Sequence, residues 1–491
     1  MKKIKLLFCT VVGSAFIHAQ IGIGTNTVIP DKSSILDIQS TTKGMLAPRM
    51  STAQRTAISQ PAESLLVYDT DLKNFFTFSG GAWKELGAFG TTNRINYKLV
   101  KSTADLASEL TSGGNTTYKL NANTLYEING TVQLDFPIDL NNAYVTGIDS
   151  GDDKLVFPTG TVFKGNTGGT IKGLTLSGNK VFEITGTASE NLIFRDCIVA
   201  NSGSVGTISN LGMVFISVVQ FSGNTTGVTY NTISQLLISN VGWFGNNKGT
   251  FEKLTGTFGL VQKQGGFSDV NGAAIGFDVS GNPTITGNAV MESVVFTGTP
   301  TPGTGFYAKG YTTGGYTNFN FNNAWNVRNP GLPTETDSNA FGAIGANYAN
   351  VGGGFAFNWT GTTTLNASKV KIAAVSSSAE VDLLRFKNDG YSKLTYDGKK
   401  ERNFEISGSM SYQAAYVGTY RAYLTLNGNI IPNTDSFGRA TAINDIVVFS
   451  LNGFTKMKKD DYVEVWMERY SYNTTQSPGN NIVPNLTVII K

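Results

Sequence analysis

The chain has 491 residues, of which 57 are glycine and 15% are charged, and its 38 basic and 35 acidic side chains nearly balance. This balance argues against nucleic acid or an anionic membrane surface as a partner. Many short Val/Ile/Phe/Tyr runs among Gly, Asn and Thr predict an all-β protein, and the length predicts several domains.

The first 19 residues have the layout of a secretory signal peptide. Lys2, Lys3 and Lys5 precede an apolar run from Ile4 to Ile17, and small or polar residues follow. The run is shorter than the ~20 residues that span a bilayer, which favours a cleaved signal over a membrane anchor. We therefore expect a secreted or cell-surface protein that is not inserted in a membrane.

Removal of this segment leaves a chain with no histidine and one cysteine, because His18 and Cys9 both lie in it. The Ser-His-Asp triad, the Cys-His pair and His-ligated zinc are then excluded. Cys197 has no partner for an intrachain disulfide and is expected as a small buried apolar residue. We predict no cofactor and no metal site.

Residues 20–88 are predicted to form a small N-terminal module. The segment 51–59 reads as a short helix with Ser51 as N-cap, Gln54 as its capping-box partner and Pro61 beyond its end. A hairpin is expected from strands at 65–68 and 75–78. The module is too small for a large core, so it needs a neighbour or a partner chain.

The amino-acid sequence of this module is more informative than its predicted helix and hairpin. The stretches "IGIGTNT", "SSILDIQSTTKGMLAPRM", "TAQRTAI", "PAESLLVYDTD" and "GGAW" resemble the N-terminal module of many exported Bacteroidetes proteins and of related phage tail-fibre proteins. The resemblance implies a surface or fibre-like protein and brings no catalytic residues with it.

Residues 89–350 show a repeat with a period in the twenties. A short helix is expected near 102–110, with Ser102 as its cap. Four asparagines then recur at spacings of 22, 23 and 22: Asn179, Asn201, Asn224 and Asn246. Three residues before each stands a large apolar residue: Leu176, Ile198, Phe221 and Trp243. Such a period with β-type content is typical of a solenoid whose turns stack apolar residues inward.

The repeat length resembles that of the right-handed parallel β-helix of the pectin-lyase-like superfamily. The stretch "YEINGTVQLDFPIDLNNAYVTGID" also resembles that family's opening strands. The alternative is one or two β-sandwiches, in which case the spacing is coincidental. Five residues before each asparagine, Asp196 stands where the other repeats have Leu or Val. We expect a register slip in that turn rather than a buried charge, since burying a lone charge is costly.

Residues 351–491 are predicted to form an antiparallel jelly-roll sandwich, because the strands lengthen and alternate. Tyr420, Ala422, Leu424 and Leu426 share one face of a strand, and Val463, Val465 and Met467 share one face of another. The stretches "LLRFKNDGYSKLTYDGKKERNFEISGSMS", "LTLNGNII" and "MKKDDYVEVWMER" resemble a C-terminal domain of phage and prophage tail proteins, similar in outline to TNF-like jelly rolls. The resemblance implies a homotrimer.

Catalysis on this fold would require paired carboxylates acting as acid and base on a polysaccharide. Asp196, Asp269 and Asp278 are the candidates: Asp269 and Asp278 on neighbouring turns, and Asp196 with Glu183. In each case a solvated or turn carboxylate is the favoured alternative. The run "DSGDD" offers Asp149, Asp152 and Asp153 to calcium, but it lacks the spacing of a known calcium loop, so an ordinary turn is favoured.

The stretch 305–327 interleaves aromatic residues with Gly, Asn and Lys309. Flat aromatic faces beside amide donors suit sugar rings, and such residues are also favoured at protein interfaces. The candidate ligand-binding residues are Tyr307, Tyr311, Tyr316 and Trp325. The alternative is that every second residue belongs to the core and the rest to a loop.

Three functions are compatible with these observations. We predict a secreted, non-catalytic, fibre-like surface protein, an adhesin or receptor-binding protein, whose homotrimer binds a glycan or a surface protein with added avidity. The first alternative is a tail-spike-like polysaccharide hydrolase or lyase using Asp and Glu, since fold alone does not decide activity. The second is a purely structural component of an extracellular assembly.

Overall fold

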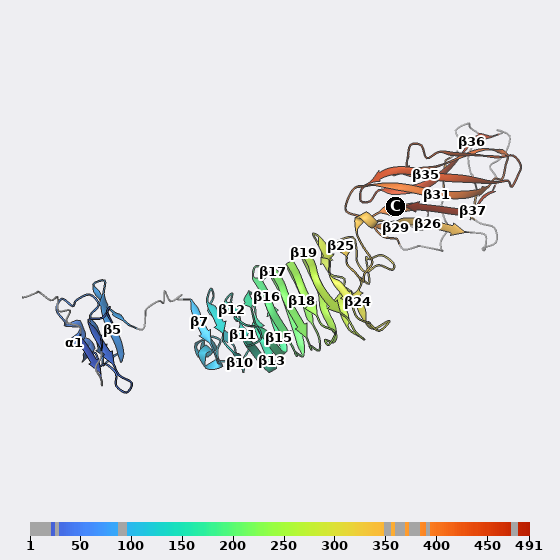
Figure 1. Cartoon of the computed structure of the whole chain (residues 1–491). Helices are drawn as coiled ribbons and strands as arrows, with labels where there is room; N and C mark the ends of the chain where they lie inside the picture. Colours follow the sequence, from blue (N-terminus) through green and yellow to red (C-terminus); the bar gives the residue numbers. More distant parts are fainter. Residues whose placement is uncertain are drawn as a thin grey trace, which may run out of the picture. The chain divides into compact units, whose positions relative to one another are not determined.

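The computed structural model describes residues 21–24, 29–86, 96–347, 355–358, 369–372, 383–388, 393–472 and 480–491. The chain divides into two compact units, Met1–Ile95 and Asn96–Lys491 (Figure 1). The expected signal peptide, residues 1–19, lies outside the described residues.

The first unit contains two small sheets. Strand β1 (Ile21–Gly24) pairs in parallel with β2 (Leu36–Gln39). The second sheet has the order β3-β4-β5-β6, and the helix α1 (Thr52–Thr56) precedes its hairpin. Its strands are β3 (Arg49–Met50), β4 (Leu66–Asp69), β5 (Asn74–Ser79) and β6 (Ala82–Glu85).

Both elements predicted for this unit are confirmed. The side chain of Ser51 accepts a hydrogen bond from the N–H of Gln54, and the Gln54 side chain accepts from the N–H of Ser51, which completes the capping box. Strands β4 and β5 pair as an antiparallel hairpin. Arg55 fixes the helix to this sheet through a buried ion pair with Asp69 (2.8 Å), and its guanidinium lies 3.9 Å from the centre of the Phe76 ring.

The second unit begins with a parallel β-helix. A short 3-10 turn, η1 (Thr103–Leu106), and the helix α2 (Ala107–Ser112) follow the first strand of this β-helix. Its strands form one continuous sheet. The strands of the first turns are β7 (Tyr97–Val100), β8 (Tyr118–Lys119), β9 (Leu125–Ile128), β10 (Thr131–Gln133), β11 (Ile138–Asp139), β12 (Tyr144–Thr146), β13 (Lys154–Gly165), β14 (Gly169–Lys172), β15 (Thr175–Thr185) and β16 (Asn191–Ala200). Those of the later turns are β17 (Ser204–Ser222), β18 (Val228–Trp243), β19 (Thr250–Asp269), β20 (Ile275–Asp278), β21 (Thr284–Ile285), β22 (Ala289–Glu292), β23 (Val295–Thr297), β24 (Phe306–Lys309) and β25 (Trp325–Arg328).

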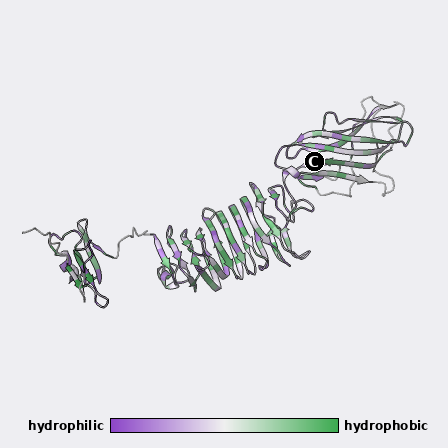
Figure 2. Cartoon of the chain, in the orientation of Figure 1, coloured by the Kyte–Doolittle hydropathy of each residue, from purple (hydrophilic) through white to green (hydrophobic). Residues whose placement is uncertain are grey.

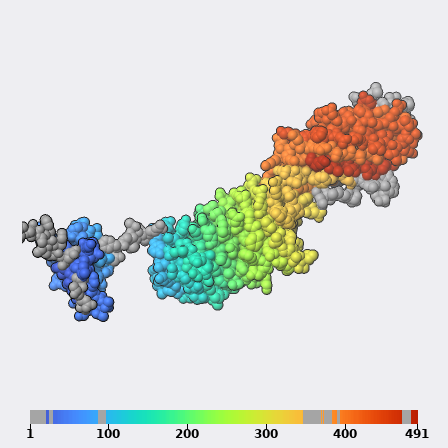
Figure 3. All heavy atoms as spheres, viewed as in Figure 1, coloured from blue at the N-terminus to red at the C-terminus, as the bar shows by residue number. Residues whose placement is uncertain are grey.

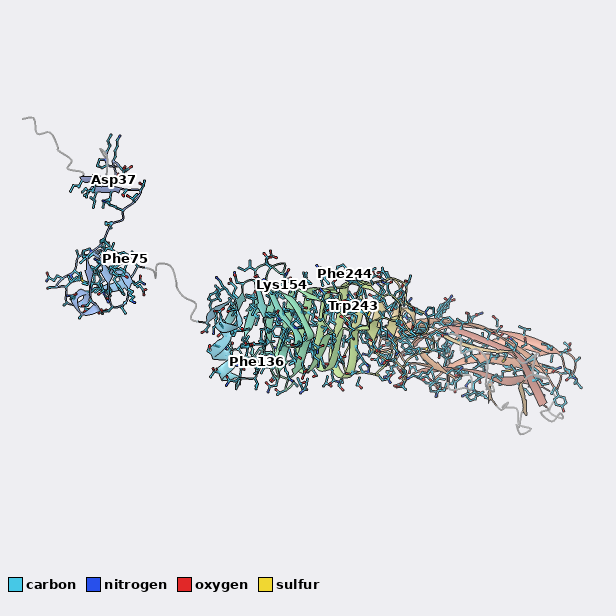
Figure 4. All side chains as sticks on the ribbon, turned by 90° about the horizontal axis from the view of Figure 1, so that it is seen from below. Asp37, Phe75, Phe136, Lys154, Trp243 and Phe244 are labelled. Carbon is cyan, nitrogen blue, oxygen red and sulfur yellow. The ribbon has the colours of Figure 1, made fainter. Side chains whose placement is uncertain are left out.

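The long strands bend around corners, so each full turn contributes to three faces of the β-helix. Inward side chains stack in rows along each face, and outward side chains form matching outer rows, which gives the alternation of apolar and polar residues seen along the strands (Figure 2). Trp243 shows the principle: its side chain is fully buried, whereas the next residue, Phe244, is 39% exposed (Figure 4). Burial of these rows supplies the main core of the molecule.

The predicted inward ladder is correct at three positions and wrong at one. Leu176, Phe221 and Trp243 occupy one inner row, but the residue between Leu176 and Phe221 is Val199 rather than Ile198. The expected register slip is therefore present, since the same shift places Cys197, and not Asp196, opposite buried Val219.

Asp196 itself stands at a corner of the turn. Its φ is 55°, and Val218 and Asn240 have φ values of 55° and 51° at the corresponding corners of the next two turns. Asp196 is partly exposed there and forms an ion pair with Arg195 (3.0 Å).

The asparagine row also differs from the prediction by one residue in places. Asn179, Asn201 and Asn246 are exposed, whereas Asn224 and Asn247 are buried. The Asn224 side chain accepts from the N–H of Ser202 (3.0 Å), and Asn247 accepts from the N–H of Asn224 (2.8 Å). These side chains satisfy backbone groups at a corner where the strand pairing stops, which explains why asparagine recurs there.

The C-terminal part is an antiparallel sandwich of two sheets. One has the order β26-β37-β31-β35, with β27 on β37; the other has the order β29-β30-β36-β32-β33, with β28 on β36 and β34 on β32. The strands are β26 (Gly342–Asn347), β27 (Phe355–Asn358), β28 (Val370–Lys371), β29 (Phe386–Asn388), β30 (Lys393–Tyr396), β31 (Arg402–Gln413), β32 (Gly418–Leu426), β33 (Asn429–Ile430), β34 (Ser436–Ala440), β35 (Ile446–Met457), β36 (Tyr462–Tyr472) and β37 (Asn480–Ile490). A further 3-10 turn, η2 (Asp337–Asn339), lies before β26.

The buried faces predicted for two strands of this sandwich, β32 and its neighbour β36, are confirmed. Tyr420, Ala422 and Leu424 of β32 are buried with Val463 and Val465 of β36, and Leu426 packs against the same core. The all-β fold class, a parallel β-helix followed by an antiparallel sandwich with a small N-terminal module, is thus the observed one.

Candidate functional site

A cavity of about 370 Å3 lies where the last turns of the β-helix meet the sandwich. Its floor comes from β22 and β25, whose register sets Val290 beside Asn326 and Glu292 beside Arg328. Its other walls come from Thr336, from the first two residues of η2 and from the segment 400–402. The size falls within the range of small-ligand sites in proteins.

Positive and negative side chains line this cavity in equal number. Arg328, Lys400 and Arg402 line it together with three carboxylates: Glu292, Asp337 and Glu401. Two of the carboxylates are neutralised from within the chain. Asp337 is bound by Arg385 (3.0 Å) and by the N–H groups of residues 399 and 400 (2.9 Å each), and Glu401 is bound by Lys456 (2.7 Å). Glu292 is the carboxylate that forms no ion pair within the described residues.

A buried arginine holds this corner of the molecule rigid. Arg385 is fully buried and donates to Asp337 Oδ1, to the carbonyl of Asn322 (2.9 Å) and to the carbonyls of Trp325 and Glu335. It thereby ties the sandwich to the closing turns of the β-helix, and the two parts lie directly against each other there (Figure 3). Satisfied buried networks of this kind rigidify the structure around them.

Glu335 completes the same corner. Its side chain is fully buried, and its two oxygens accept hydrogen bonds from the N–H groups of Asn320 and Phe321 (2.8 Å each). Burial raises the pKa of Glu335 to about 7, although these hydrogen bonds and Arg385 act in the opposite direction. The charge state of this corner therefore changes near neutral pH.

The first unit exposes an unusual share of its apolar side chains. Each of the following is at least 40% exposed: Ile21, Ile23, Ile29, Ile35, Leu36, Ile38, Met45 and Leu46. Strand β1 is exposed along its whole length, and β2 nearly so. Contiguous exposed apolar surface marks an interaction site.

The sandwich has a second apolar surface at its edge. Strand β35 is the edge strand of its sheet, and its outward side chains include Ile446, Val448 and Phe454, which are 62%, 66% and 77% exposed. Exposed hydrophobic edge strands promote pairing with another chain unless they are covered.

The structure separates the predicted carboxylates. Asp278 is buried, bonds Ser280, and pairs in register with Lys253 and Lys309. Asp269 pairs in register with Thr297 on another face. The register therefore does not align Asp269 with Asp278.

Glu183 and Asp196 are also apart in the register. Glu183 lies on the face that carries Lys164 and Thr207, whereas Asp196 stands at the corner described above. Asp153, from the proposed calcium ligands, accepts from the N–H groups of Gly130, Ile148 and Asp149, as an ordinary turn residue does. Among the described residues no group of acidic, His or Cys side chains is arranged to hold a metal.

The predicted aromatic ligand site belongs to the closing end of the β-helix. Trp325 is fully buried, and its Nε1–H donates to the Tyr311 hydroxyl (3.1 Å), which donates to the carbonyl of Pro283. Tyr316 is 8% exposed and donates to Asp397 of the sandwich (2.9 Å), and Tyr307 donates to the carbonyl of Gly298. The proposal that Tyr316 and Trp325 stack on sugar is thus corrected, because neither has a free ring face.

Sequence reasoning missed the cavity. Its residues come from four segments spread over more than a hundred positions, 290–292, 326–328, 336–338 and 400–402, so no local motif marks them. Cys197 is buried as predicted, and burial raises the pKa of its thiol to about 12. No helix in the described part of the chain is long and apolar enough to cross a membrane.

The comparisons with known proteins bear on the first unit. Residues 22–102 match the family model described as a phage tail like trimerisation region. No curated protein matches the chain significantly. The matched trimerisation region and the parallel β-helix that follows fit a phage tail-fibre-like protein, and the exposed apolar residues of β1 and β2 lie within or directly beside the matched range.

Two solved structures from phages are similar in outline only. The match to the crystal structure of the Acinetobacter phage vB_ApiP_P1 tailspike protein covers 90% of this chain and 100% of the tailspike chain, with 9% identity and a TM-score of 0.28. The match to the enzymatically active domain of bacteriophage CBA120 tailspike protein 4 covers 91% of this chain and 77% of that domain's chain, with 8% identity and a TM-score of 0.21. At these values neither structure bears on the function proposed below.

Proposed function

We propose that this chain is a secreted, fibre-like surface protein that assembles as a homotrimer and binds a glycan or a surface protein without cleaving it. The match of residues 22–102 to a trimerisation region carries the proposal. The β-helix serves as a stiff shaft, since every turn is bonded to the next along its length. A rigid trimer presents three weak sites at once and gains avidity from them.

The apolar surfaces support assembly. Those of β1 and β2, and of β35 at the sandwich edge, lie on separate units of the chain and are each exposed to solvent in a single copy. The repeated crossings of the chain between the two C-terminal sheets, after β31, β34, β35 and β36, support a jelly roll as part of this proposal. Contact between copies at both places would remove this apolar surface from water.

The cavity beside β22 and β25 is the ligand site that we favour. The three cations Arg328, Lys400 and Arg402 outnumber Glu292, the one lining carboxylate that forms no ion pair within the described ranges. Carboxylate groups on a glycan would pair with these cations, and guanidinium groups bind carboxylates in a planar, two-point manner. An acidic polysaccharide is therefore the expected ligand class.

The number of carboxylates in this cavity that are not held in ion pairs argues against cleavage. A glycoside hydrolase requires two carboxyl groups that flank the scissile bond, one as acid and one as base or nucleophile. In this cavity Asp337 and Glu401 are engaged by Arg385 and Lys456, which leaves Glu292 alone. We base the proposed binding without cleavage on this difference between Glu292 and the two ion-paired carboxylates.

The test is one incubation of the full chain with immobilised neutral and uronate-containing polysaccharides, read both as retention and as new reducing ends or unsaturated uronate. We expect saturable retention on acidic glycans without cleavage, and at least ~10-fold weaker retention after Arg328→Ala combined with Lys400→Ala, since charged hydrogen bonds contribute about 1.5–3 kcal/mol each. Lys253→Ala, on another face of the β-helix, is the matched control. Appearance of cleavage products would refute the non-catalytic function.

A further inference from the structure

One face of the β-helix carries an apolar row on its outside. On successive turns the register aligns outward residues of β7, β9, β12, β14, β16, β17 and β18. We call six of them the apolar stripe: Tyr97, Leu125, Tyr144, Ile193, Phe215 and Leu237. Thr170 interrupts the row. Tyr97 and Tyr144 are 41% and 51% exposed, and the other four are half-buried.

The other faces have no comparable row. On the face that carries Lys164, the outer row alternates in charge along the β-helix. Its members are Lys164, Glu183, Thr207, Thr229, Lys253, Asp278 and Lys309. The third outer row is mixed, with Lys154 and Gln220 before Phe267 and Val295. The apolar stripe is thus a property of one face and not of the repeat in general.

The stripe has the composition of an interface. Protein interfaces combine an apolar centre that lacks charge with a polar rim. After Leu99 of β7, the neighbouring outer row on the same face is polar and follows the stripe turn by turn: Glu127, Thr146, Lys172, Arg195, Ser217 and Ser239. Parallel sheets are also covered on both sides in most proteins, and here the core covers only the inner side.

We propose that the apolar stripe packs against a second copy of this chain, so that the trimer is held along the β-helix and not only at the N-terminal unit. The inference rests on the proposed homotrimer. The matched trimerisation region ends at residue 102 and therefore includes β7 with Tyr97, the first residue of the stripe. The stripe continues, turn by turn, from a segment that already has an assembly role in the matched family model.

Hydroxyl-radical footprinting of the full chain tests this contact with an internal control. Tyr144 of the stripe is 51% exposed in a single copy, whereas Phe244 on another face is 39% exposed. Tyrosine and phenylalanine react with comparable ease, so a free stripe would label Tyr144 at least as fast as Phe244. We expect Tyr144 to be labelled several-fold more slowly in the assembled protein.

Light scattering on the same sample separates the two proposals. A monomer would refute the homotrimer itself, and a trimer in which Tyr144 is labelled as fast as Phe244 would overturn only the stripe contact. As a second test, Phe215→Asp with Leu237→Asp should lower the temperature at which the trimer dissociates. Thr207→Asp with Thr229→Asp, outward residues of the same strands β17 and β18 on the charged face, should leave it unchanged. Equal effects of the two pairs would count against the stripe.

Discussion

The buried carboxyl of Glu335 makes stability depend on pH in an uncommon direction. Its pKa rises from the ordinary 4.5 to about 7 in the folded chain because burial disfavours the charged form. Between pH 4.5 and 7 the folded state holds a proton that the unfolded chain has released. The free energy of unfolding therefore falls as pH rises through this window, the opposite of what a salt-bridged carboxylate produces.

The size of the effect follows from the pKa difference. A displacement from 4.5 to about 7 corresponds to about 3 kcal/mol. This contribution is fully present below pH 4.5 and is lost above about pH 7. Glu335→Gln removes the titration, but its amide nitrogen cannot accept one of the two backbone hydrogen bonds, which adds a loss of stability that does not depend on pH. Relative to the natural protein, we expect the variant to gain about 2–3 kcal/mol of stability between pH 5 and pH 8.

Hydrogen exchange is the suitable assay, because a chain of two units has no single free energy of unfolding. The backbone N–H groups of Asn320 and Phe321 donate to Glu335 and report on this corner directly. The quantity to compare is the protection of the peptide that contains them, variant against natural protein, at each pH. Glu401→Gln, at an exposed glutamate of the neighbouring cavity, should show no such change. A difference between Glu335→Gln and the natural protein that is the same at pH 5 and pH 8 would refute the reasoning.

Three further predictions concern the β-helix. Trp243→Ala should cost about 3–5 kcal/mol of stability and Phe244→Ala less than about 1, because only the first side chain is buried; paired thermal unfolding scans check this. Asn224→Ala should cost about 2–4 kcal/mol, since buried backbone groups lose their partners, while exposed Asn246→Ala should cost far less in the same scans. Cys197 should resist thiol reagents at pH 8 in the folded protein and react at once in denaturant; fast labelling of the native chain would contradict its burial.

Local chemistry made much of the fold predictable from the sequence. The capping box of Ser51 and Gln54 and the period of the apolar rows depend on residues close in the chain, and both are present. The one misplaced ladder residue, Ile198, shows the limit of the method. The spacing of recurring asparagines aligns successive turns only to within one residue. A shift of one residue along a strand exchanges its inward and outward side chains.

The cavity could not be predicted from the sequence, because its residues come together only in the folded chain. The cavity joins β22 and β25 to a turn of the sandwich at 400–402, and those segments meet through contacts between residues far apart in the chain, such as Arg385 with Trp325 and Tyr316 with Asp397. The aromatic residues near the same place were visible in the sequence, but Trp325 and Tyr316 close the core rather than facing solvent. Composition alone does not distinguish a sugar-stacking ring from a buried one.

The mass of the assembled protein in solution, measured by light scattering on the full chain over a range of concentrations, tests the central claim most directly. The account predicts three times the mass of one chain, persisting on dilution, because the exposed apolar residues of β1, β2 and β35 and the apolar stripe are all covered by neighbouring copies. A mass equal to that of a single chain would contradict it.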